Sequence, residues 1–149
     1  MSLQDKVMVE MKAAMKAKDS VALESLRAVK SEILLASTSG ASHDGLTEEE
    51  ELKLLQRLVK QRKDSAAIFT EQGREDLAGP ELAQAEIISK FLPEQMGEDE
   101  IAAVVENIIL QTGASGMKDM GKVMGAANQA LAGRADGKTI SGIVKAKLS

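Results

Sequence analysis

Two stretches near the C-terminus come close to the spacing of a phosphate-binding loop. Residues 116–123 read GMKDMGKV, where Val123 stands in place of the hydroxyl side chain that would hold Mg²⁺. Residues 133–139 read GRADGKT, which ends in Lys-Thr but is one residue short. The true motif follows a buried strand. Here an irregular turn precedes the first stretch and a helical pattern precedes the second, so we do not expect a nucleotide triphosphatase.

Catalytic and metal-binding side chains are scarce in this sequence. His43 is the only histidine, it lies in a polar segment, and the chain has no cysteine. One histidine alone forms neither a typical zinc site nor a partnered general base. Serine nucleophiles lack a partnered base, and the acidic clusters lie at helix starts, where capping accounts for them. The prediction is a protein with no active site, no metal and no cofactor of its own.

The C-terminal tail holds the residues best suited to binding. Between residues 112 and 149, six Lys and Arg face only Asp119 and Asp136, a net charge of +4 in a chain whose total is −4. Without Trp or Tyr for base stacking, an RNA contact here would depend on shape and phosphate and would weaken with salt. The candidate nucleic-acid-binding residues are Lys118, Gly121, Lys122, Gly125, Arg134, Lys138 and Lys145.

Gly121 and Gly125 lie four residues apart within a helical pattern. Glycine costs about 1 kcal/mol relative to alanine inside a helix, so two of them need a physical reason. Close approach of another backbone is one reason. That backbone is either a neighbouring helix in a three-helix bundle or an RNA strand, and the sequence leaves both explanations open.

A second basic strip lies nearer the N-terminus. Lys60 and Lys63 share a helix face, with Asp64 four residues after Lys60, and Arg27 and Lys30 are likewise three residues apart. The favoured interpretation is a salt-bridged surface between packed helices. The alternative is a strip that binds phosphate or the acidic groups of a protein.

These residues need a scaffold, and the composition favours helices. Leu, Ile, Val, Met and Ala supply nearly all the apolar surface, with two Phe and no Tyr or Trp, whereas sheets favour aromatic and β-branched residues. Apolar residues recur at intervals of three and four, as in Leu3, Val7, Met11, Ala14 and Met15. The predicted class is all-α, with helices over about 3–17, 21–36, 47–73, 80–91, 98–111, 117–131 and 138–148.

Cap signals and helix breakers set the expected boundaries. Thr47 with Glu50 three residues later forms a capping box, and Pro80 suits a first turn, so a fourth helix is expected to begin there. Pro93 ends that helix and divides the chain into an N-terminal bundle of long helices, 1–95, and a small C-terminal three-helix domain, 96–149. Further expected caps are Asp19 or Ser20, Gly113, Gly133, and Asp136 or Thr139.

No feature of the sequence marks a membrane protein. No apolar stretch approaches the roughly 20 residues that cross a bilayer, and residues 1–6 lack the apolar core of a signal peptide. The lack of cysteine suits a reducing compartment. We expect a soluble, cytoplasmic protein that does not bind membranes.

Several stretches taken together resemble the stand-alone YqeY members of the GatB/YqeY family. They are residues 59–65 (VKQRKDS), 73–77 (GREDL), 91–95 (FLPEQ), 120–125 (MGKVMG) and 133–137 (GRADG). The likeness covers nearly the whole chain, from residue 26 to residue 148. It implies an N-terminal helical domain followed by a small three-helix domain.

The resemblance also implies a link to tRNA. Similar domains form the tail of GatB, a subunit of the glutamine-dependent amidotransferase that converts misacylated Glu-tRNA or Asp-tRNA. In that enzyme the tail contacts tRNA, while the kinase and transamidation chemistry reside elsewhere. By carry-over, Gly121, Lys122, Gly125, Arg134 and Lys138 match the region expected to approach tRNA.

Three functional expectations follow in order of preference. The first is a non-catalytic tRNA-binding module, because this chain has no counterpart of the catalytic part of GatB. The second is a protein-interaction adaptor of a tRNA amidotransferase or an aminoacyl-tRNA synthetase. The third is a carbon–nitrogen ligase with glutamine as amido donor, for which the sequence offers neither a nucleophile nor an ATP site.

Overall fold

The computed structural model describes residues 2–38 and 45–149, and the regular structure in these two stretches is entirely helical. Seven α-helices and one short 3₁₀ helix follow one another, with no strand among the described residues. The all-α prediction is therefore confirmed. His43 lies outside the described residues.

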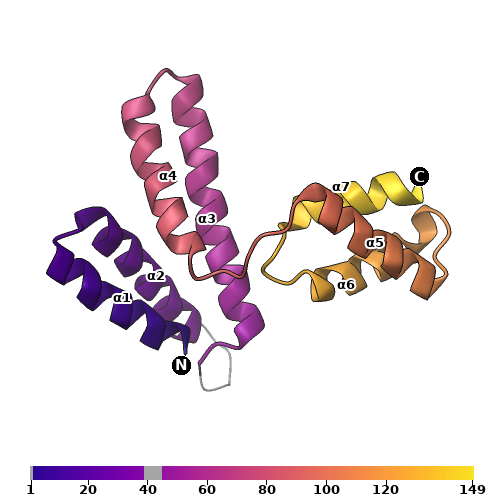
Figure 1. The fold of residues 1–149 in the computed structure, drawn as a ribbon, viewed down its shortest axis with the longest axis horizontal. Coiled ribbons are helices and arrows are strands. Elements are labelled where there is room, and N and C mark those ends of the chain that lie inside the picture. Colours follow the sequence, from indigo (N-terminus) through magenta and orange to yellow (C-terminus); the bar gives the residue numbers. More distant parts are fainter. Residues whose placement is uncertain (1, 39–44) are drawn as a thin grey trace. The chain divides into compact units, whose positions relative to one another are not determined.

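The chain forms two compact units, Met1–Leu92 and Pro93–Ser149, whereas the sequence placed the division at residue 95. Each unit has its own set of helices, coloured along the chain in Figure 1. The first unit contains α1 (Leu3–Ala17), α2 (Ser20–Thr38), α3 (Glu48–Glu71) and α4 (Glu75–Ser89). The second contains α5 (Glu98–Thr112), the 3₁₀ helix η1 (Met117–Asp119), α6 (Met120–Ala130) and α7 (Gly137–Leu148).

Side-chain caps fix where helices of the first unit begin. The Glu50 N–H donates to the Thr47 hydroxyl at 3.2 Å, and the Thr47 N–H donates to the Glu50 carboxylate at 3.3 Å. This is the predicted capping box at the start of α3. At the start of α2 the Ala22 N–H donates to the Asp19 carboxylate at 3.0 Å, which confirms Asp19 as a cap.

The apolar faces of α1, α2, α3 and α4 meet in one core. Helix α2 packs against the other three, and Val7, Val29, Leu55 and Ile88 are almost fully buried. Each such side chain stabilises the fold by about 1.5–3 kcal/mol. Met15 was predicted to share the buried stripe of α1, and that prediction is wrong, since it is 54% exposed. The main neighbour of α1 is α2, so its buried stripe is narrow and Met15 lies beyond the edge.

Helices α3 and α4 form a hairpin that turns at Gly73 (Figure 1). Gly73 has a φ of +71°, a backbone conformation that favours glycine. Its N–H donates to the Thr70 carbonyl at 3.0 Å, and the Arg74 N–H donates to the Phe69 carbonyl at 2.7 Å. These two bonds form a Schellman motif, which satisfies the carbonyls at the end of α3. The predicted interruption at Gly73 is confirmed.

The fourth helix begins earlier than the sequence predicted. Helix α4 starts at Glu75 and contains Pro80 in its interior, whereas the prediction placed Pro80 in the first turn. The turn at Gly73 leads the chain into helix almost at once. Pro80 has no N–H to donate to the carbonyl of Asp76, four residues back, and this part of α4 is exposed, since Asp76, Gly79 and Pro80 are all exposed residues.

The second unit has a core of its own. Helices α5, α6 and α7 each contact the other two, and Val105, Val123, Leu131 and Val144 are buried among them. The segment predicted as one helix over 117–131 is a 3₁₀ turn followed by α6.

The ends of these helices are only partly as predicted. Gly113 caps the end of α5 with a φ of +67°, and the Thr139 N–H donates to the Asp136 carboxylate at 2.8 Å, so both predicted caps are confirmed. Gly133 was predicted to cap α6, and this is wrong because Leu131 holds that position. Gly133 has a φ of +75° in the turn that follows.

Candidate nucleic-acid interface

Gly121 and Gly125 lie on the side of α6 that faces away from the core. Both are exposed, whereas Val123 and Ala127 on the opposite side are fully buried. A Cβ atom placed on either glycine would meet no neighbouring heavy atom within 4 Å among the described residues. Tight packing against a neighbouring helix, one of the two explanations left open, is therefore wrong. The bare helix backbone at these positions is accessible to an external partner.

Arg134 is engaged with the segment that opens the second unit. Its Nε donates to the Glu94 carbonyl at 3.2 Å, and its own carbonyl accepts from the Met96 N–H at 2.9 Å. Gln95 Nε2 donates to the Gly133 carbonyl at 2.7 Å. We call these contacts the 94–134 clasp. The sequence placed Arg134 among candidate RNA contacts, and the structure gives its guanidinium a partner within the protein.

Two further cations of the second unit also have internal partners. Lys122 Nζ donates to the Thr112 carbonyl at 3.4 Å, at the C-terminal end of α5, where the helix dipole favours a positive charge. Lys147 forms an ion pair with Glu106 of α5. Lys122 and Lys147 therefore already have partners within the second unit, and a ligand would have to compete with them.

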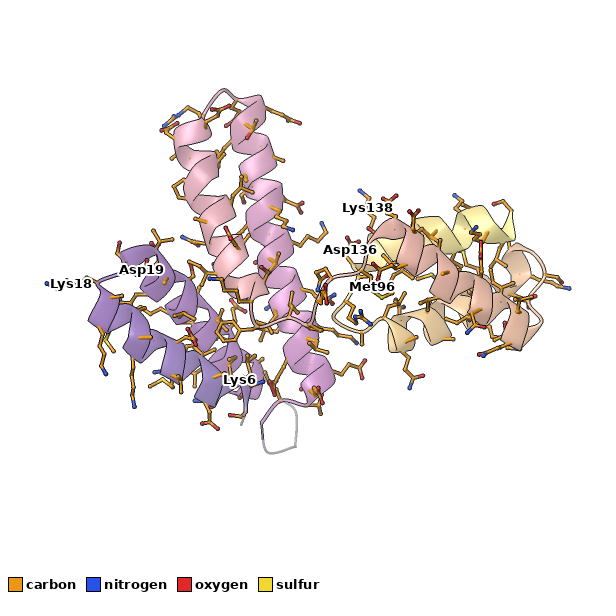
Figure 2. The ribbon with its side chains drawn as sticks, in the orientation of Figure 1. Lys6, Lys18, Asp19, Met96, Asp136 and Lys138 are labelled. Carbon is orange, nitrogen blue, oxygen red and sulfur yellow. The ribbon has the colours of Figure 1, made fainter. Side chains whose placement is uncertain are left out.

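Three candidate cations remain uncommitted. Lys118, Lys138 and Lys145 are exposed, and the described residues offer none of them a hydrogen-bond or ion-pair partner. The side chain of Lys138 extends away from the ribbon in Figure 2. The two acids of the tail accept hydrogen bonds from backbone N–H groups: Asp119 accepts from the Ser115 N–H at 2.8 Å, and Asp136 caps α7.

The two stretches with phosphate-loop spacing have other structures. Residues 116–123 span η1 and the first turn of α6, and residues 133–139 span the turn before α7 and the first residues of that helix. Both stretches are fully described, and each follows helical structure instead of a strand. Neither presents the strand-supported loop that holds nucleotide phosphates.

One pair in the basic strip of the first unit forms the expected ion pair, and the neighbouring Arg62 links two helices. Lys60 Nζ and the Asp64 carboxylate are 2.9 Å apart, which confirms the salt-bridged interpretation for this pair. Arg62 is half-buried, and its Nε donates to the Gln84 side chain at 3.0 Å, linking α3 to α4. Its Nη1 donates to the Leu58 carbonyl at 3.2 Å.

One ion pair in the first unit shifts a pKa. Arg74 Nε and Nη2 donate to the two carboxylate oxygens of Asp76 at 3.0 and 2.9 Å. The hydrogen bond from Arg74 lowers the pKa of Asp76 below its ordinary value and raises the pKa of Arg74. The pair lies at the exposed turn between α3 and α4, and neither residue lines the cavity between α1, α2 and α4. We therefore interpret the Arg74–Asp76 pair as a local contact that supports the turn between α3 and α4.

A cavity of about 540 Å³ opens in the first unit between α1, α2 and α4. Its wall is mainly apolar, and its polar groups are Lys6, Glu10, Asp19 and Lys90. Within residues 2–38 and 45–149, no three His, Cys, Asp or Glu side chains are grouped to hold a metal ion. None of the described helices combines the length and the hydropathy needed to cross a bilayer.

An exposed glycine inside a helix of the second unit was missed by the sequence reasoning. Gly142 lies in the middle of α7, is exposed, and has open space where a Cβ would stand. The available signal was the same one that singled out Gly121 and Gly125, namely an interior helical position that costs about 1 kcal/mol.

Over residues 2–38 and 45–149, these features define a helical protein of two units, whose second unit exposes glycine backbone and lysines with no partner among those residues. Comparison with known proteins agrees with the resemblance noted from the sequence. The chain belongs to the YqeY-like protein family, which it matches over residues 4–148.

Individual relatives cover this chain to different extents. Altered inheritance of mitochondria protein 41, mitochondrial, from Pyrenophora tritici-repentis is 31% identical over 133 residues, 87% of this chain and 71% of that protein. Its counterpart from Clavispora lusitaniae is 37% identical over 91 residues, 61% of this chain and 52% of that protein. A glutamyl-tRNA(Gln) amidotransferase subunit from Thermococcus gammatolerans is 30% identical over 96 residues, 62% of this chain and 15% of that protein. The chain thus spans about half of one such relative and a small part of another.

Proposed function

We propose that this protein is a non-catalytic, tRNA-linked binding module. In this proposal the C-terminal three-helix part, residues 96–149, contacts RNA. The observation that carries the proposal is the pairing of exposed glycine backbone on α6 with uncommitted lysines in the same unit. Likeness to a glutamyl-tRNA(Gln) amidotransferase subunit supports tRNA as the RNA and the amidotransferase as a functional neighbour.

The chemistry of the surface favours recognition of backbone over bases. The chain has no Trp or Tyr on which bases could stack, while Lys118, Lys138 and Lys145 offer three ammonium groups. Duplex RNA is recognised mainly through shape, phosphates and 2′-hydroxyls. Three phosphate contacts would give a slope of about −2 to −3 when the logarithm of affinity is plotted against the logarithm of salt concentration.

Binding of fluorescently labelled total tRNA, measured from about 50 to 200 mM salt, tests the proposal. We expect saturable binding that weakens with salt, and a variant with Lys118, Lys138 and Lys145 replaced by Gln that binds far less tightly. A control variant replaces Lys12, Lys16 and Lys18, exposed lysines of the first unit, in the same way. No binding at the lowest salt, or equal loss in both variants, would rule out the proposed surface.

An adaptor role is the second candidate, and the cavity between α1, α2 and α4 favours it. Val9 lies on its wall and is 52% exposed, so an apolar group of a partner could bury it. The partner would be the amidotransferase or an aminoacyl-tRNA synthetase. Capture of either purified enzyme by the wild type, lost in Val9→Glu but kept in the triple Gln variant, supports the adaptor. Ammonia release from glutamine by the purified chain would instead contradict a non-catalytic role.

For the location, we keep the cytoplasm as part of the proposal. The word mitochondrial stands in the names of the two fungal relatives and is a statement about those proteins. Fractionation of the source cells with antibody against this chain tests the location, and recovery with an organelle would contradict it.

A further inference from the structure

The outward face of α7 carries Lys138, Gly142 and Lys145. Their spacing of four and then three residues places them on one side of the helix. All three are exposed, whereas Ile140 and Val144 are buried on the opposite side. This α7 face is separate in sequence and helix from the glycines of α6.

Two features of the α7 face lower the stability of the helix itself. Gly142 costs about 1 kcal/mol in a helix interior, and a Cβ there would meet nothing within 4 Å among the described residues. Lys138 lies in the first turn, where the positive end of the helix dipole disfavours a cation by roughly 0.3–1 kcal/mol. No internal contact offsets either cost within the described chain. Local rules are broken in this way mainly at functional sites.

The α7 face is also richer in basic than in acidic groups. Helix α7 contains no Asp or Glu, and the one acid next to it, Asp136, caps the helix. Its third lysine, Lys147, is paired with Glu106, whereas Lys138 and Lys145 have no internal partner in the described chain. On α6, by contrast, the adjoining Lys122 already reaches the Thr112 carbonyl.

We propose that the α7 face is a second contact surface for the RNA sugar–phosphate backbone. Lys138 and Lys145 would each meet a phosphate, separated by about 10 Å along the helix axis. Gly142 between them lets the strand approach the helix backbone, where a larger side chain would hold it off. The inference rests on the proposed function and adds to it a face and a residue that sequence reasoning did not find.

Bulk added at Gly142 tests the assignment. Gly142→Leu should weaken tRNA binding at least tenfold, because the side chain would occupy the space of the strand. Gly125→Leu makes the same change on α6, and Ala103→Leu adds bulk at an exposed position of α5 outside both faces. Leucine is a better helix former than glycine, so both glycine variants should fold, which circular dichroism will verify.

The lysines give an independent measurement. Lys138→Gln together with Lys145→Gln should lower the affinity and reduce the salt slope by about two, since each phosphate contact contributes about one. Lys12→Gln together with Lys16→Gln, exposed lysines of α1, should leave the slope unchanged.

The outcomes separate this inference from the proposed function. If Gly125→Leu weakens binding and Gly142→Leu does not, the α7 face is overturned while tRNA binding stands. If Gly142→Leu and the α7 lysine pair both weaken binding and Ala103→Leu does not, the α7 face is supported. If the wild type does not bind tRNA at about 50 mM salt, the proposed function and this inference both fail.

Discussion

The Nε atom of Arg134 donates a hydrogen bond to the carbonyl of Glu94, a residue forty positions earlier in the chain, at 3.2 Å. Together with the hydrogen bonds made by Gln95 and Met96, this contact ties the entry of the second unit to the turn between α6 and α7. Both stretches belong to the sequence motifs that marked the family resemblance. The 94–134 clasp gives a structural reason for the presence of both motifs, because residues of one bond directly to residues of the other.

Removal of the guanidinium should loosen the clasp. Arg134→Ala is expected to lower the free energy of unfolding of the second unit by about 1 kcal/mol, since a hydrogen bond to a charged donor at a partly exposed site is lost. Hydrogen exchange at the Met96 amide should accelerate in the same variant. Lys138→Ala removes a cation that has no hydrogen-bond or ion-pair partner among the described residues, so it should not lower the free energy of unfolding and should leave the Met96 exchange rate unchanged. An unchanged Met96 exchange rate in Arg134→Ala would show that the clasp does not depend on this side chain.

The bare glycines of α6 should tolerate a methyl group. Gly121→Ala and Gly125→Ala are each expected to raise stability by up to about 1 kcal/mol, because nothing lies within 4 Å of the new Cβ among the described residues. Gly113→Ala should instead lower stability by about 1 kcal/mol, since its φ of +67° is strained for alanine. Thermal unfolding followed by circular dichroism measures all three. Destabilisation by Gly121→Ala would mean that this face is packed.

Asp76 should titrate at unusually low pH. Its pKa is lowered from the ordinary value of 3.8 by the hydrogen bond from Arg74. A carboxylate whose folded pKa is depressed adds stability above its unfolded pKa and loses it as the pH falls through the folded value. The Arg74–Asp76 contact should therefore be intact at neutral pH and lost in strong acid. Carboxyl NMR titration should give a midpoint below 3.8 in the wild type and a return towards it in Arg74→Ala.

The two cores should respond separately to cavities. Ile88→Ala removes a fully buried side chain of the first unit and should cost about 2–5 kcal/mol there. Val105→Ala, in the core of the second unit, should act on that unit instead. Hydrogen exchange read peptide by peptide will show which helices lose protection. Equal loss in both units from either variant would indicate a single cooperative structure.

Features encoded within a few residues were predictable from the sequence. The Thr47–Glu50 capping box and the Asp136 cap were predicted because each needs only two groups three positions apart. The apolar spacing likewise indicated the helical class, because burial on one side of a helix repeats every three to four residues.

Features that depend on distant partners were not predictable. Arg134 and Lys122 are ordinary cations in the sequence, and their carbonyl partners become visible only once the chain has folded. The early start of α4 depends on the turn at Gly73, which overrides the local preference of Pro80. The openness around Gly121 and Gly125 was equally hidden, since glycine at a given spacing does not reveal whether a neighbour lies against it.

Helix α6 is eleven residues long and has two glycines in it, so it has little intrinsic tendency to remain wound. Its persistence depends on the burial of Val123 and Ala127 against the rest of the second unit. Within that unit it should be the segment whose amides open most readily to solvent. A molecule that binds the glycine side of α6 would reduce this opening. Binding could therefore be detected as slower deuterium uptake by the α6 amides, without a dye on either molecule.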